Sequence, residues 1–147
     1  MGLLMERRNF VEFDADFPDD AVWDEDGNNL VPGGQAIAEY LRNQLRERGL
    51  PTSKLVQHHF YGWAFEISSE EVDVWCLLQG GGDWLLIVDP RLSLIERLVG
   101  SSRLSGFDKV RSILHDILSN DSHFAKVMWY TRRDYESGRS DRGQPSP

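Results

Sequence analysis

Carboxylates offer the richest chemistry in this sequence, because nine of them lie between Arg8 and Arg42 with no Lys or Arg among them. The other 15 Asp and Glu are balanced by the 16 Lys and Arg, so the formal net charge of −8 arises almost entirely in this stretch. A concentrated negative field attracts cations and steers positively charged partners. The nine residues are Glu12, Asp14, Asp16, Asp19, Asp20, Asp24, Glu25, Asp26 and Glu39.

Part of this acidic stretch begins like a calcium-binding loop, with Asp24, Asp26 and Asn28 at alternate positions. An EF-hand loop also needs Gly at its sixth position and a bidentate Glu at its twelfth. Here those positions hold Asn29 and Gln35, which can supply neither the sharp turn nor the two carboxylate oxygens. The sequence therefore predicts no EF-hand, and no other spacing indicates a resident metal or a cofactor.

Histidine and cysteine offer a second kind of chemistry. His58 and His59 are adjacent, so in a strand they are expected to point to opposite faces and cannot chelate one ion together. Cys76 lies on the apolar register of its strand, with no nearby cation to lower its pKa, and is expected to be a buried hydrophobic residue. We therefore predict no catalytic residue.

The elements that must position these residues begin with a strand at 8–13 and a loop at 14–20. The clearest element is a helix over 34–48, in which Ile37 and the apolar residues after it recur at helical spacing. Gly49 is a suitable C-cap for this helix, and Pro51 prevents its continuation.

The rest of the chain alternates strands and helices. Residues 54–67 form two strands or one bent strand, and a hairpin turn at Gly80–Asp83 joins strands at 72–78 and 84–88. A short helix is expected over 91–99, a second main helix from a capping signature at Ser105 and Asp108 to about Asn120, and a last strand at 124–130.

This order of elements predicts an α+β domain spanning residues 1–131. Its sheet is expected to be mostly antiparallel, with about five to six strands and two main helices packed on one face. Residues 132–147 are rich in Gly, Ser, Pro and charged residues, and this composition predicts a disordered C-terminal tail.

Composition limits the class of protein. Forty per cent hydrophobic and 11% aromatic residues are typical of a folded globule, and the single cysteine excludes an intramolecular disulfide. The negative charge argues against binding to nucleic acid or to an anionic membrane surface, both of which need clustered Lys and Arg. With no apolar run near the roughly 20 residues that span a bilayer, we expect a cytoplasmic protein.

These features favour a non-enzymatic protein-binding domain that uses its acidic N-terminal face to bind a basic partner, as immunity proteins and some regulators do. Phe17 and Trp23 interrupt the acidic stretch and are candidate anchors.

Two alternatives stay open. One is a small-molecule or metal-dependent enzyme, with a site between the sheet and the acidic loop and with His58 or His59 as its titrating group; the other is a structural or regulatory subunit. The sequence also leaves a homodimer open. The predicted partner-binding residues are Asp14, Asp16, Phe17, Asp19, Asp20, Trp23, Asp24, Glu25 and Asp26.

Overall fold

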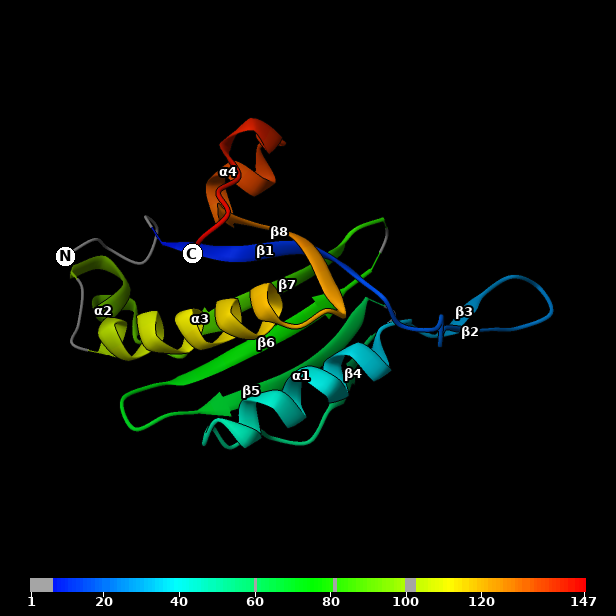
Figure 1. Cartoon of the computed structure of the whole chain (residues 1–147), viewed down its shortest axis with the longest axis horizontal. Helices are drawn as coiled ribbons and strands as arrows, with labels where there is room; N and C mark the ends of the chain where they lie inside the picture. The colour runs from blue at the N-terminus through cyan, green and yellow to red at the C-terminus, as the bar shows by residue number, and fades with distance from the viewer. Residues whose placement is uncertain (1–6, 60, 81, 100–102) are drawn as a thin grey trace.

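The computed structural model of the protein describes residues 7–59, 61–80, 82–99 and 103–147 (Figure 1). It contains one six-stranded sheet in which every neighbouring pair is antiparallel. The strand order is β4 (Val56–His58), β5 (Gly62–Ser68), β6 (Asp73–Gln79), β7 (Trp84–Pro90), β1 (Arg8–Ala15) and β8 (Phe124–Thr131). Helices α1 (Gln35–Glu47) and α3 (Arg103–Asn120) pack on one face, and α2 (Leu94–Val99) precedes α3. The predicted α+β architecture is confirmed.

The main core lies between the sheet and these two helices. Along β6, Val74, Cys76 and Leu78 are fully buried and belong to this core, as the period of two predicts. Leu41 on α1 and Leu114 on α3 are also fully buried in it. Burying each such side chain stabilises the fold by about 1.5–3 kcal/mol relative to leaving it exposed to solvent. The apolar faces of α1 and α3 therefore stabilise the fold by covering one face of the sheet.

The start of α3 differs from the prediction. The helix begins at Arg103, so Asp108 lies inside it and caps nothing. Instead Asp108 accepts hydrogen bonds from Arg7 Nε at 2.8 Å and from Arg111 Nη2 at 2.5 Å, and both guanidinium groups are buried. Burial opposes ionisation of Asp108, but the bonds from Arg7 and Arg111 outweigh it and lower its pKa. The short-range sequence pattern could not reveal a partner about a hundred residues away.

The C-terminal segment 132–147 was predicted to be disordered, and the structure instead gives it a defined conformation. It forms α4 (Arg132–Glu136) and a 3₁₀ turn, η2 (Ser140–Arg142), and Gln144 then exchanges two backbone hydrogen bonds with Trp129 on β8. The Tyr135 ring lies 5.2 Å from Phe10 and 5.7 Å from Tyr130, on the sheet face opposite α1 and α3. One aromatic residue with a distant partner thus anchors a segment whose composition is polar.

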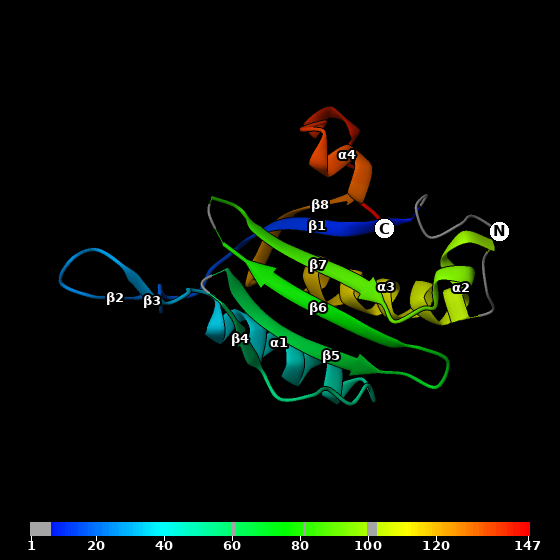
Figure 2. The same ribbon diagram turned by 180° about the vertical axis from the view of Figure 1, so that it is seen from behind.

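Two further strands, β2 (Val22–Trp23) and β3 (Asn29–Val31), pair in a separate hairpin. Figures 1 and 2 show this hairpin projecting from one end of the sheet, opposite the end that carries α2 and the start of α3. In the view from behind, β5, β6 and β7 lie in front of α1 and α3, and α4 lies beside β1 and β8 (Figure 2). Among the described residues, no helix is long and apolar enough to cross a membrane.

Candidate partner-binding surface

The carboxylate of Asp24 stabilises the turn of the β2–β3 hairpin. Asp24 accepts hydrogen bonds from the backbone N–H groups of Asp26 at 2.9 Å and Asn28 at 2.8 Å, and from the Asn28 amide at 2.9 Å. The bonds from Asn28 lower the pKa of Asp24, because they favour its charged form. Gly27 completes the turn with a φ of 84°, which other residues rarely adopt. Asp24 therefore shapes the hairpin as well as charging it.

Asp20, another predicted partner-binding residue, acts as the N-terminal cap of α1. Its two carboxylate oxygens accept hydrogen bonds from Gly34 N–H at 2.7 Å and Ala36 N–H at 2.8 Å, which would otherwise lack partners at the helix start. Gly34 is required here, because its φ is 99° and a Cβ would lie 2.7 Å from the Trp84 ring. This long-range cap explains how a helix follows Pro-Gly-Gly without a local capping side chain.

Phe17 is part of the fold and is not an exposed anchor. Its half-buried ring lies 5.4 Å from Tyr40, 5.1 Å from His123 and 5.9 Å from Phe124, and it packs against the main core. Asp19 accepts a hydrogen bond from the nearby Ala21 N–H at 3.0 Å. These contacts hold the start of the acidic segment against α1 and β8.

The remaining carboxylates keep most of their charge uncompensated. Asp14 pairs with Lys126 at 3.4 Å, but the lysine side chain is 82% exposed, so this pair contributes little. In the part of the chain that the structure describes, no Lys or Arg lies within ion-pair distance of Asp16, Glu25 or Asp26. The hairpin and its base therefore present negative charge to solvent.

The same end of the sheet carries a further sign of this field. Glu12 on β1 has a raised pKa, first because it is partly buried and second because the charge of Asp83 lies near. Asp83 lies between β6 and β7, outside the acidic stretch that the sequence singles out. The negative region is therefore wider than residues 9–41.

Trp23 is the aromatic residue of the acidic segment that remains available to a partner. It is 60% exposed, and Val22 and Leu30 on the same hairpin are 46% and 49% exposed. Large exposed hydrophobic side chains beside carboxylates are the arrangement in which interfaces gain affinity from the apolar centre and association rate from the charged rim. The hairpin combines both.

His58 and His59 lie apart from Cys76 in the folded chain. His58 and His59 do not point to opposite faces as predicted, because His59 leaves the strand with a φ of 52° and its ring lies 5.1 Å from that of His58. His58 packs against Trp75, whereas Cys76 is fully buried on the helix-facing side, where burial raises its thiol pKa. Neither His58 nor His59 can therefore pair with Cys76, because the sheet separates them.

His123 belongs to a hydrogen-bonded group with Asp121 and Tyr40. His123 Nδ1 lies 2.6 Å from Asp121 Oδ1, and the Tyr40 hydroxyl donates a hydrogen bond to the other oxygen of Asp121. Burial opposes ionisation of Asp121, but the bonds from Tyr40 and His123 lower its pKa. His123 and its neighbours Ser122 and Phe124 line a cavity of about 410 Å³, and Asp14 and Ala15 line it as well. No short-range pattern indicates this group, because Tyr40 lies 81 residues from Asp121 in the sequence.

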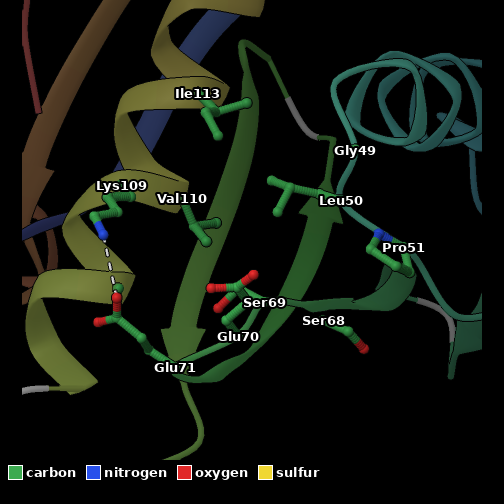
Figure 3. A pocket seen from close by; sticks show the side chains of 11 residues that line it. Gly49, Leu50, Pro51, Ser68, Ser69, Glu70, Glu71, Lys109, Val110 and Ile113 are labelled. Atoms are coloured by element: carbon green, nitrogen blue, oxygen red, sulfur yellow. Dashed lines mark hydrogen bonds and ion pairs between the residues drawn. The ribbon is translucent and has the colours of Figure 1, made fainter.

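A second cavity, of about 480 Å³, lies on the helix-covered side of the sheet (Figure 3). Val110 and Ile113 on α3 face Leu50, which follows α1, and Lys109 forms an ion pair with Glu71 at its rim. The hydroxyl of Ser69 at this cavity is already engaged with the backbone of Val72. The lining of this cavity is mostly apolar.

Within the described ranges, no group of three or more His, Cys, Asp or Glu is arranged to hold a metal ion. Comparison with known proteins adds no family: no family model, curated protein or solved structure matches this chain. Any functional conclusion therefore rests on the geometry of the site.

Proposed function

We propose that this protein is a non-enzymatic cytoplasmic domain that binds a basic protein through its acidic N-terminal face, in the manner of an immunity protein or a regulator. The single observation that carries this proposal is the β2–β3 hairpin. It projects from the body with an exposed Trp23 next to Glu25 and Asp26, and neither carboxylate has a Lys or Arg partner among the described residues.

Some carboxylates of the acidic stretch stabilise the fold and others do not, and this difference supports the proposal. Asp20 and Asp24 hold α1 and the hairpin turn in place, whereas the carboxylates of Asp16, Glu25 and Asp26 make no such contact with the other described residues. A field held on an ordered arm has a fixed direction, so it orients a cationic partner as well as attracting it. Such steering raises association rates by about 10- to 1,000-fold at low ionic strength.

The test compares two variants that remove the same amount of charge. D16N/E25Q/D26N neutralises exposed residues of the acidic face, and E47Q/E70Q/D73N neutralises three exposed residues elsewhere. Proteins retained from the native cell by the wild type are identified, and association rates of each variant with the retained partner are measured at low and high salt.

The first variant should associate at least about tenfold more slowly than the wild type at low salt, with the difference shrinking as salt screens the field. The second should lie close to the wild type. Equal rates for both variants, or a retained partner that is acidic, would contradict the proposal.

A further inference from the structure

Exposed large hydrophobic side chains gather at one end of the molecule. Among the described residues there are seven, and two of these, Leu94 and Ile95, lie on α2 at the opposite end. The other five belong to the hairpin and to the edge of the sheet around β4. We call these five the end patch: Val22, Trp23, Leu30, Val56 and Tyr61.

One side-chain amide ties the two halves of the end patch together. Gln57 Nε2 on β4 donates to the carbonyl of Leu30 at 3.4 Å and to the carbonyl of His59 at 2.8 Å. The His59 ring in turn lies 6.3 Å from Tyr61. Figures 1 and 2 both place the start of β5 beside the base of the hairpin. Hairpin and sheet edge therefore form one surface.

The charge around the end patch indicates which kind of partner it can bind. Glu25 and Asp26 lie at the hairpin turn, Asp16 lies at its base, and the chain has no Lys or Arg from residue 9 to residue 41. A second copy of the chain would bring the same carboxylates against these, and like charges across an interface cost several kcal/mol. A partner with positive charge around an apolar centre is complementary in both respects.

We propose that the end patch is the docking surface for a basic protein that presents an apolar pocket bordered by Lys and Arg. Trp23, which is 60% exposed, enters the pocket, and Tyr61, which is 65% exposed, completes the contact from the sheet edge. This inference rests on the proposed function, since it places the basic partner and states what its surface must offer. It adds Val56 on β4 and Tyr61 to a site that the sequence confined to the acidic segment.

The experiment uses three synthetic amphipathic peptides of equal length as probes: one of Lys and Leu, one of Lys and Ser, and one of Glu and Leu. Binding to the full chain is measured by titration, and the contacted residues are mapped by amide chemical shifts. The variants are W23A and Y61A, with W23F as the conservative replacement and L94A/I95A as the matched control on α2. Thermal melts establish that each variant folds, and light scattering gives the oligomeric state.

The Lys–Leu peptide should bind most tightly and shift amides in both 22–31 and 56–61. W23A and Y61A should each weaken its binding about tenfold or more, W23F should restore most of it, and L94A/I95A should have no effect.

Three outcomes would overturn the inference. If both basic peptides bind equally and Y61A matches the wild type, the end patch is not the docking surface, although the proposed function stands. If no basic peptide binds, the proposed function fails with it. If the wild type is a dimer that W23A converts to monomers, the end patch is a contact between copies.

Discussion

At the end of the molecule that carries α2 and the start of α3, acidic and basic side chains pair: Asp89 with Arg97, Glu96 with Arg103, and Asp108 with Arg7 and Arg111. At the hairpin end, Asp20 and Asp24 instead accept hydrogen bonds from backbone N–H groups, and among the described residues there only Asp14 pairs with a lysine. Among the described residues, charged side chains at the α2 end therefore form stabilising ion pairs, whereas Glu25 and Asp26 at the hairpin end are exposed to solvent.

The two ends also expose hydrophobic residues differently. Leu94 and Ile95 on α2 are more than 70% exposed, but the charges beside them, on Glu96 and Arg97, are already paired. Trp23 is exposed next to Glu25 and Asp26, which have no Lys or Arg partner within the described ranges. Exposed apolar area is common on protein surfaces, and its combination with uncompensated charge is what distinguishes the hairpin end.

The largest effect on stability should come from the paired end. D108N leaves Arg7 and Arg111 buried with a weakened acceptor, and because Asp108 is itself 41% exposed we expect a loss of about 2–3 kcal/mol in the free energy of unfolding. Urea unfolding measures it, with D116N on the exposed side of the same helix as control, expected within about 0.5 kcal/mol. Equal midpoints for the two variants would mean that Asp108 is not a structural partner.

The pH dependence of the same variant sharpens this result. The pKa of Asp108 is lowered from its ordinary value of 3.8 in the folded protein, so its contribution is present above that pH and is lost as the pH falls through the folded-state pKa. The stability difference between wild type and D108N should therefore be full at neutral pH and should shrink below pH 3.8. A difference that stays constant into strong acid would assign the effect to packing.

A smaller loss should come from the structural carboxylate of the acidic end. D20A removes both hydrogen-bond acceptors at the start of α1, which should cost about 1 kcal/mol, whereas D20N should retain part of the cap. Chemical denaturation of the two variants gives the comparison. If D20A unfolds at the same urea concentration as the wild type, α1 does not depend on this cap.

The smallest effect should come from the exposed part of the hairpin. W23S and E25Q/D26N should each leave the free energy of unfolding within about 0.5 kcal/mol of the wild type, because Trp23 is 60% exposed and the two carboxylates support no described contact. Thermal and urea unfolding measure it, with L94S as the matched change on α2. A loss as large as that of D20A would make the hairpin part of the scaffold.

Local pattern was enough to predict most elements. The apolar stripe of α1 is complete within 13 residues, and the helix found at 35–47 lies inside the predicted 34–48. The alternation along β6 likewise predicted the burial of Cys76, and the glycine-rich turn after β6 predicted its pairing with β7. The proposed site was predicted less completely: the sequence identified the acidic stretch and Trp23 as candidates, but it could not separate Asp20 and Asp24, which hold the fold, from Glu25 and Asp26.

What the sequence determined by itself is what short-range spacing encodes: the amphipathic helices, the alternating strands and the separation of negative charge into one stretch. Tertiary structure alone decided which groups meet. It placed Asp20 at the start of α1, Asp108 between two buried arginines, Tyr135 against the sheet, and Gln57 between hairpin and sheet edge. A side chain's hydrogen-bond partner is chosen by proximity in the folded chain, and residues far apart in sequence carry no local signal of that proximity.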